Sequence, residues 1–427
     1  MNRCEKRPTP QACAKGRRIS AKEVILIALL LAPVFRPWAV NVVPDGWGLL
    51  VHRTWLFASF AIALVMLVRF RKISSPLFLV SSALFGWLLL STVINGGNLW
   101  TWVDLWLTGW LATGIVIACW DEWRYELAYV VFLITTLFSL ANLLSMLLVP
   151  GGFDPGYHMY FGGSRNSVYQ FAFPCVFAGL YVDGIRSRRM PLCFLLALLI
   201  TVAQLVLDLS TTAAIALAFA IVVLALLRRS RIRSVLTSYI YLIGSVLTTL
   251  LVVVFRVQEH LGFIVTGLFG KSLTLSGRAP VWDFVMSSID TGHLLAGRGV
   301  SGYQMIFVGG RQFYHTHNMY LELVFSGGLV ALFLFIVLLL LYSRKQWKVR
   351  CSIYGSFSAA AIGSYFVVGI TEPMLCSSFF LVVAFAYCLC SGAYSRRSAL
   401  DGVCCSRFVG RGSGFRGSPR HLTDAVE

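Results

Sequence analysis

Residues 329–350 read LVALFLFIVLLLLYSRKQWKVR, an unbroken apolar run that ends at Tyr342 and is followed at once by four basic residues. With the residues that precede it from 317, the run is long enough to cross the hydrocarbon core of a bilayer, which takes about 20 helical residues. A basic cluster directly after such a run is typical of the cytoplasmic end of a span. The stretch therefore predicts a membrane helix, and the same alternation recurs along the chain.

The composition of the whole chain agrees with this prediction. Its 427 residues are 58% hydrophobic and 13% charged, with a mean hydropathy of +0.77, whereas soluble domains average about 25% charged residues. So few charged side chains cannot cover a water-soluble body of this size. The composition excludes a soluble enzyme, a disordered scaffold and a secreted disulfide-rich module. The eleven cysteines show neither a disulfide framework nor a zinc-ligand spacing.

Apolar runs bounded by charge predict an all-α polytopic membrane protein with about twelve transmembrane helices. Their ranges are 23–43, 49–68, 76–94, 103–119, 126–149, 167–184, 190–207, 211–227, 235–255, 317–342, 352–371 and 374–392. The first is the weakest, because Pro33, Arg36 and Pro37 lie in its outer half. A further apolar run, Leu261–Gly270, is too short to span, so we expect it to lie in the interface or to re-enter the membrane.

Basic residues gather in alternate gaps between the predicted helices. One side of the membrane, which includes both tails, receives 28 of the 36 Lys and Arg residues, and the other side receives 8. Because basic residues concentrate on the cytoplasmic side, both termini are predicted to be cytoplasmic. We expect a basic tail over 1–22, a transmembrane domain over 23–392 and a second basic tail over 393–427. The net charge of +18 has this origin and does not indicate a nucleic-acid partner.

Two predicted extracytoplasmic loops, 150–166 and 256–316, are longer than the rest. Loops of this length usually serve a function, and these two gather most of the histidines. His315 and His317 stand two residues apart just before a span, where an imidazole near neutral pKa could act as a general base; the alternative is a histidine that solvates the helix end. A metal site is disfavoured, because residues i and i+2 point to different sides of a helix and no third ligand follows at a recognised spacing.

Three arginines in these loops, each within three residues of a glycine, could bind an anion: Arg165, Arg278 and Arg298. Guanidinium groups bind phosphate oxygens bidentately and stay charged, and glycine lets a backbone approach a bulky group. The alternative is that they pair with Asp154, Asp283 or lipid headgroups.

Glu372, Glu322 and Asp104 are among the carboxylates that fall in or beside predicted spans. Glu372, before Pro373 at the outer end of its span, would hold an arginine in position or cap the turn, because an unpaired carboxylate there is costly. Glu322 and Asp104 are expected to be packing partners.

Several of these residues, in this order, resemble the O-antigen ligase and O-antigen polymerase superfamily. In that family a His-Asn pair, here His317-Asn318 before Tyr320 and Gly327-Gly328, closes the large extracytoplasmic loop. Also similar to its pattern are Ser276-Gly277-Arg278 with Trp282, the stretch Gly297-Arg298-Gly299, the pair Arg165-Asn166 and the turn Thr371-Glu372-Pro373. The ligase- or polymerase-like region covers about 150–392.

The resemblance implies a type C membrane glycosyltransferase of the bacterial plasma (inner) membrane that needs neither metal nor cofactor. Its donor would be a glycan linked through a diphosphate to undecaprenol. Arg165 and Arg278 would bind that diphosphate, and His317 would activate the acceptor hydroxyl, with His315 as the other candidate imidazole. The residues that would bind substrate beside them are Arg298, Asn318, His315 and Glu372.

The resemblance leaves the acceptor open. A polymerase would join repeat units of a surface polysaccharide (O-antigen, capsule or exopolysaccharide), whereas a ligase would join the glycan to lipid A core or another acceptor. An alternative of another class is a transporter or flippase for the lipid-linked glycan, although no repeat relates the two halves of the chain, as transporters of two-fold design would show. Expected partners are the lipid-linked glycan, membrane lipids, and a chain-length regulator and flippase of the same pathway.

Overall fold

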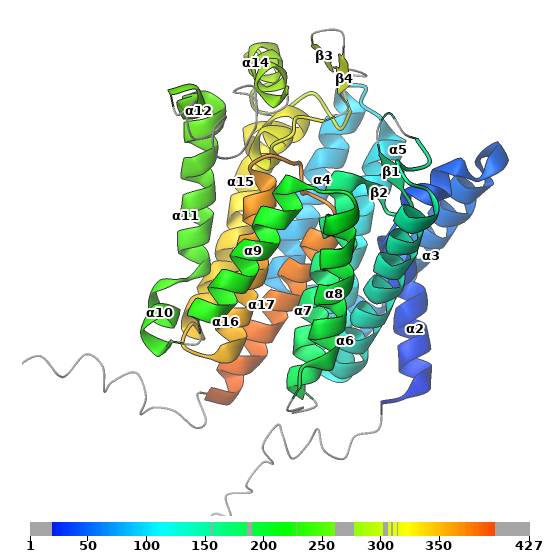
Figure 1. Ribbon diagram of the computed structural model, residues 1–427, viewed down its shortest axis with the longest axis vertical. Coiled ribbons are helices and arrows are strands. Elements are labelled where there is room, and N and C mark those ends of the chain that lie inside the picture. Colours follow the sequence, from blue (N-terminus) through cyan, green and yellow to red (C-terminus); the bar gives the residue numbers. More distant parts are fainter. Residues whose placement is uncertain are drawn as a thin grey trace, which may run out of the picture.

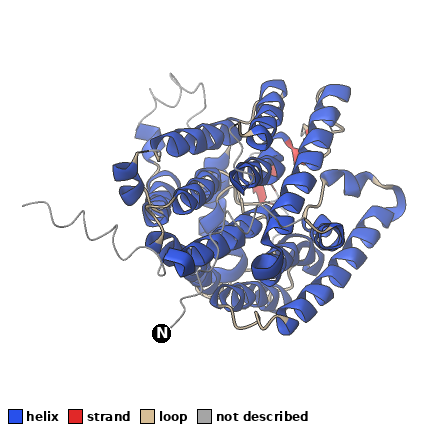
Figure 2. Cartoon of the chain, turned by 90° about the horizontal axis from the view of Figure 1, so that it is seen from below, coloured by secondary structure: helices blue, strands red, loops and turns tan. Residues whose placement is uncertain are grey.

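The computed structural model describes residues 19–397 except 155, 157, 186–189, 228, 261–276, 302–305, 309–310 and 314. The described chain is mostly helical, and its longer helices run roughly side by side along one direction (Figure 1). The view from below shows the same helices grouped as a bundle (Figure 2).

The helices are α2 (Ala21–Leu31), α3 (Trp47–Arg69), α4 (Pro76–Ile94), α5 (Leu99–Trp102), α6 (Thr108–Leu148), α7 (Tyr169–Ile185), α8 (Leu192–Leu207), α9 (Thr211–Leu226), α10 (Ser230–Val235), α11 (Ser238–Thr249), α12 (Val257–His260), α14 (Arg278–Ser288), α15 (Met319–Lys348), α16 (Ile353–Gly369) and α17 (Ser377–Arg397). Two antiparallel hairpins are β1 (Met159–Tyr160) with β2 (Gly163–Ser164) and β3 (Ile306–Val308) with β4 (Arg311–Phe313). We call the end of the bundle that carries α5, α12, α14 and both hairpins the loop end (Figure 1).

Four of the described helical stretches are long and apolar enough to cross a membrane: Pro44–Arg69, Pro76–Ile94, Leu99–Leu148 and Met319–Lys348. Shorter apolar helices accompany them at Leu192–Leu207, Thr211–Leu226, Ser238–Val254, Ile353–Gly369 and Ser377–Gly392. Each stretch overlaps a range predicted from the sequence. The prediction of a helical membrane protein with little sheet is confirmed at this level, while the count of twelve spans and the sides of the two termini stay predictions.

The predicted span 23–43 is wrong in its second half. Helix α2 ends at Leu31, and 3₁₀ turns follow at Ala32–Val34 and Trp38–Val42. Pro33 and Pro37 cause the change, because proline lacks the N–H that an α-helix needs and fixes its own φ.

The predicted loop 256–316 is partly helical. Helix α14 begins at Arg278, directly after Gly277 in the left-handed conformation (φ 87°). It buries Val281, Trp282 and Val285, which share one helical face because they are three and four residues apart. Val281 and Val285 pack with Phe325 of α15, so this loop is fastened to the bundle. The apolar run 261–270 lies outside the described residues.

Helix α6 stands at the centre of the packing. It contacts α2, α3, α7, α8 and α17, and Leu111, Ala112, Ile115 and Val116 are fully buried in it. The helix covers two predicted spans, 103–119 and 126–149, and departs from helical geometry between them at Trp123 (φ −128°). The predicted boundary therefore appears as a kink in one long helix.

Helix α15 is interrupted at Gly328 (φ 67°, ψ −167°), and the chain before it packs into the interruption. The backbone N–H of Arg298 donates to the carbonyl of Phe325 at 2.7 Å, and that of Leu329 donates to the carbonyl of Leu294 at 2.9 Å. The end of the long loop is thus hydrogen-bonded to the backbone of a membrane helix.

Glycine is needed on both sides of this contact. A Cβ on Gly328 would lie 2.1 Å from the carbonyl oxygen of Leu295, and a Cβ on Gly297 would lie 2.4 Å from the backbone nitrogen of Gly327. The glycine beside Arg298 therefore lets two backbones meet. The interpretation that it admits an anion is wrong, because this space is filled by α15.

We expect Gly328→Ala to destabilise the protein by at least about 1–3 kcal/mol, since alanine rarely adopts this φ/ψ region and has no space there. Thermal unfolding of the purified protein in detergent measures the effect. Gly86→Ala in α4 is the matched control, because its Cβ would meet nothing within 4 Å and alanine favours a helix. Equal melting temperatures for the two variants would contradict the assignment.

Candidate functional site

The carboxylate of Glu372 is the point at which distant parts of the chain meet. It lies after α16, almost fully buried at the loop end. Its Oε1 accepts hydrogen bonds from Nη2 of Arg278, which forms an ion pair with it, and from Nδ2 of Asn166 at 3.1 Å. Its Oε2 lies 3.4 Å from Nδ1 of His317. Three predicted site residues, from α14, from the start of α15 and from the turn after α16, are therefore in contact.

This carboxylate is ionised at neutral pH. Burial alone would raise the pKa of Glu372, but the hydrogen bond from His317 and the charge of Arg278 outweigh burial and lower the pKa to about 2. An ionised carboxylate can only accept hydrogen bonds. The proton of a neutral His317 ring therefore lies on Nδ1, and the basic lone pair lies on Nε2.

His315 stands beside His317 with the two ring centroids 4.1 Å apart. Its Nδ1 is enclosed and has no hydrogen-bond partner among the described residues. Burial and the neighbouring His317 lower the pKa of His315 to about 3, so this ring is neutral. Of the two imidazoles that the sequence left open, His317 is the one whose ring nitrogen lies within hydrogen-bond distance of a carboxylate, that of Glu372.

The backbone at His317 is strained. Its φ of 53° lies in the left-handed region, which costs a residue other than glycine of order 1–3 kcal/mol and persists only where neighbours enforce it. Thr316 supplies much of that restraint. Its carbonyl accepts from Nε1 of Trp282 at 2.9 Å, its N–H donates to Glu322 at 3.0 Å, and its hydroxyl donates to the carbonyl of Asn318 at 2.9 Å. Glu322 is a packing partner, as predicted.

Asn318 connects the two sides of the site. Its Oδ1 accepts from the N–H groups of Tyr320 at 3.1 Å and Leu321 at 3.0 Å, which caps α15. Its Nδ2 donates to the carbonyl of Ile370 at 3.0 Å. The buried amide thereby sets the start of α15, and with it His317, against the turn that carries Glu372. A direct contact of Asn318 with substrate stays a prediction.

Arg165 directly precedes Asn166 in the chain. Its Nη1 lies 3.5 Å from Oδ1 of Asp208. Asp208 also lies 2.9 Å from Nδ1 of His158 and accepts from the hydroxyl of Tyr160 at 2.8 Å. Sequence reasoning missed Asp208, although a carboxylate at the outer end of a predicted span was an available signal. Arg165 is thus joined to the site through Asn166, and its side chain remains 47% exposed.

Arg298 is not part of this cluster. Its Nε and Nη2 donate to the carbonyl of Ser288 at 2.8 and 2.6 Å, and its Nη2 lies 3.1 Å from the exposed Asp290. These contacts hold the end of α14. Substrate binding by Arg298 stays a prediction.

Residues 196–336 match the model of a family described as O-antigen ligase. This match confirms the resemblance predicted from the sequence, which is to a family of membrane polysaccharide polymerases and ligases. The matched segment includes Asp208, Arg278 and His317, whereas Arg165 and Glu372 lie outside it. No curated protein matches the chain.

Three side chains of the site could also hold a metal ion. His315, His317 and Glu372 each offer one ligand atom, and these atoms lie within 4.8 Å of one another. The sequence disfavoured a metal because no third ligand follows the two histidines at a recognised spacing. The third ligand, Glu372, is 55 residues from His317, and folding brings it to the histidines. Arg278 and Asn166 already donate to this carboxylate, so a cation would compete with a guanidinium for it.

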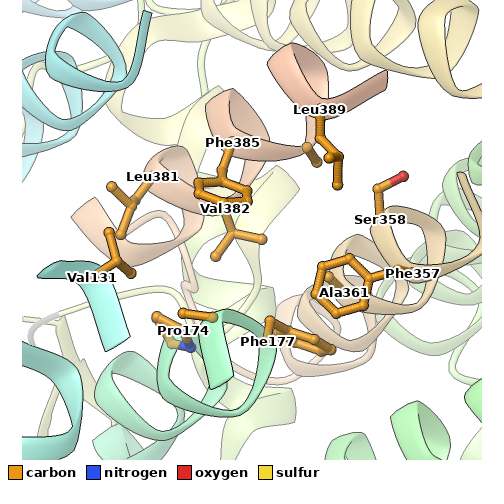
Figure 3. Close-up of a pocket in the computed structure, with 12 residues that line it drawn as sticks. Val131, Pro174, Phe177, Phe357, Ser358, Ala361, Leu381, Val382, Phe385 and Leu389 are labelled. Atoms are coloured by element: carbon orange, nitrogen blue, oxygen red, sulfur yellow. The ribbon is translucent and has the colours of Figure 1, made fainter. Parts of the chain in front are cut away.

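A small apolar cavity of about 30 Å³ lies elsewhere, between α6, α7, α16 and α17. Figure 3 shows side chains from all four helices around it, among them Val131, Pro174, Phe357 and Val382, with the hydroxyl of Ser358 at one edge. No titratable side chain lines this cavity, so it offers no groups for acid–base chemistry. The reactive groups gather at Glu372 instead.

We expect the carboxyl of Glu372 to stay ionised down to pH 4. At that pH a pKa of about 2 leaves about 1% of the carboxyl protonated, whereas the ordinary pKa of 4.5 would leave about three quarters of it protonated. Because the pKa is lowered on folding, the stabilisation is complete above the unfolded pKa and is lost as pH falls towards 2. Infrared difference spectra of wild type minus Glu372→Gln measure the protonated carboxyl band. A band at pH 5 would contradict the assignment, and in Arg278→Gln the titration should move to higher pH.

Proposed function

We propose that this protein is a glycosyltransferase that moves a glycan from a lipid diphosphate to an acceptor hydroxyl at the extracytoplasmic face of the bacterial plasma membrane. We further propose that it works without a metal and that its product is a surface polysaccharide. The observation that carries the proposal is one buried, ionised carboxylate, Glu372, that contacts both His317 and Arg278, in a chain that matches the O-antigen ligase family.

The proposed reaction uses these groups in one displacement. The acceptor oxygen attacks the anomeric carbon of the donor, and Nε2 of His317 takes the hydroxyl proton. The bond from that carbon to the diphosphate oxygen breaks, and the diphosphate leaves with the electron pair. Arg278 and Arg165 stabilise the charge that develops on it, as preorganised cations do best in a partly dry site.

Glu372 acts as a positioning residue in this mechanism. It orients the ring of His317 and stabilises the imidazolium that forms when Nε2 takes the proton, as the aspartate of a Ser-His-Asp triad does. The same carboxylate forms an ion pair with Arg278. Glu372 therefore holds the proposed base, His317, and the proposed phosphate-binding group, Arg278, at a fixed distance from each other. Asn166 brings the loop of Arg165 to the same carboxylate.

A polymerase is the form of this activity that we prefer, and a ligase is the second candidate because the matching family model describes one. The two differ only in the acceptor. Purified protein would receive a lipid-diphosphate-linked repeat unit with no nucleotide and with a chelator present. Growth of the glycan supports a polymerase, and transfer only to a lipid A core acceptor supports a ligase. Unchanged glycan that only crosses a vesicle membrane, or activity abolished by the chelator, would overturn the proposal.

We expect His317→Ala to lower kcat by about 10²–10⁴-fold, the usual contribution of a general base. Arg278→Ala should lower it by about 10²–10³-fold, since one preorganised charge-stabilising group is lost. Initial rates of lipid-diphosphate release measure both. His293→Ala is the matched control, because His293 also contacts a carboxylate, Asp290, but at an exposed place outside the site. An active His317→Ala variant would exclude His317 as the base.

A further inference from the structure

A second cationic cluster lies at the loop end, far from His317 in sequence. Arg36, in the turn after α2, and Arg53 of α3 share the carboxylate of Asp104. Nη1 of Arg36 lies 2.7 Å from Oδ2, and Arg53 donates from Nε to Oδ1 at 3.1 Å and from Nη2 to Oδ2 at 2.8 Å. Two guanidinium groups thus face one carboxylate, and the cluster carries a net charge of +1.

This extra charge lies beside an apolar surface. The side chains of Arg36 and Arg53 are only 22% and 21% exposed, and Arg53 stacks over Trp100 at 4.3 Å. Trp100, Trp47 and Leu50 are themselves exposed, as side chains that face lipid would be. An uncompensated charge next to lipid is costly, so the cluster favours an anion from the membrane interface.

His52 supplies an independent observation. The residue is 7% exposed, and its Nε2 is buried with no hydrogen-bond partner among the described residues. The ring lies within electrostatic reach of Arg36, Arg53 and Asp104. Buried polar atoms are normally hydrogen-bonded, so this nitrogen has a hydrogen-bonding position to spare for a ligand. A ring nitrogen that carries its proton donates to a phosphate oxygen.

The local backbone is also unusual at this place. Asp104 lies in a π-helical turn, Val103–Leu107, and such turns are rare and frequent at functional sites. The N–H of Ala39 donates to the carbonyl of Phe161 at 3.2 Å. This contact joins the segment after Arg36 to the β1–β2 hairpin that precedes Arg165.

We propose that Arg36, Arg53 and His52 bind the phosphate group of a second lipid-linked substrate. The inference rests on the proposed function, because a polymerase must hold two lipid diphosphates at once and the arginines beside Glu372 serve one. Each guanidinium has five N–H donors, of which Asp104 and Asn41 engage only a part. The remaining donors and Nε2 of His52 bind the phosphate oxygens.

The test measures binding of farnesyl diphosphate to the full-length protein in detergent by isothermal titration calorimetry. We expect two binding sites in the wild type and one in Arg278→Ala. The triple variant Arg36→Gln, Arg53→Gln, Asp104→Asn should keep the site at Arg278. Its affinity for farnesyl diphosphate at the second cluster should be about ten- to hundredfold weaker, because charged hydrogen bonds are removed. Arg69→Gln is the matched control, because it also lowers the net charge by one, at the opposite end of α3. A triple variant that still binds two molecules would overturn the inference.

Competition identifies the source of the phosphate. Inorganic pyrophosphate that competes as well as farnesyl diphosphate would mean a site for free phosphate, and phosphatidylglycerol that competes equally would mean a site for bulk lipid; either result overturns the inference. Should the triple variant not fold, a photoactivatable farnesyl diphosphate on wild-type protein replaces it. We expect labelled peptides within 36–53 or 99–104, and their absence would contradict the site.

The failure of this inference is distinguishable from failure of the proposed function. Binding at the second cluster does not require glycosyl transfer, so two sites without Arg278-dependent transfer would overturn the enzyme and leave the phosphate site. Arg278-dependent transfer with a single binding site would overturn the second cluster alone.

Discussion

A carboxylate buried at the end of a helical bundle has to be neutralised, and the surroundings of Glu372 follow from that requirement. Removing a charge from water costs several kcal/mol unless charged and hydrogen-bonding partners compensate. Here the partners are Arg278, Asn166 and His317, which come from three separate segments of the chain. The electrostatic demand of one side chain therefore assembles the residues that the proposed chemistry uses. It also keeps the carboxylate ionised, and this sets the proton of His317 on Nδ1.

Holding those loops against the bundle is a matter of backbone packing. The segment before His317 follows the interruption of α15 at Gly328 closely enough that no side chain fits between the two backbones. Trp282 is fully buried and donates to the carbonyl of Thr316, which restrains the left-handed residue that follows. The strain at His317 is thus maintained by packing distributed over α14 and α15.

Most of the helices could be predicted, because about 20 apolar residues between charged clusters have few alternatives in a membrane. The prediction of helices failed where constraints other than apolar length decided whether a helix forms or where it ends. Prolines ended the first span at Leu31. Helix α14 was missed within a long loop because its apolar face has only four buried positions and Phe325 completes it. For the site, His317, Arg278 and Glu372 could be singled out as types and motifs. The part played by Asp208 and the choice between His315 and His317 could not be predicted, because both depend on which atoms lie within hydrogen-bond distance.

The sequence by itself determined that the chain is a helical membrane protein, that most of its histidines and three candidate arginines lie in two long loops, and that its motifs resemble one family. Periodicity and composition are local properties, so they can be read along the chain. Only the tertiary structure decided that one carboxylate contacts His317 and Arg278, that His315 remains neutral beside them, and that Arg36 and Arg53 converge on Asp104. Contacts between residues 50 or more positions apart depend on how helices pack, and no local pattern encodes that packing.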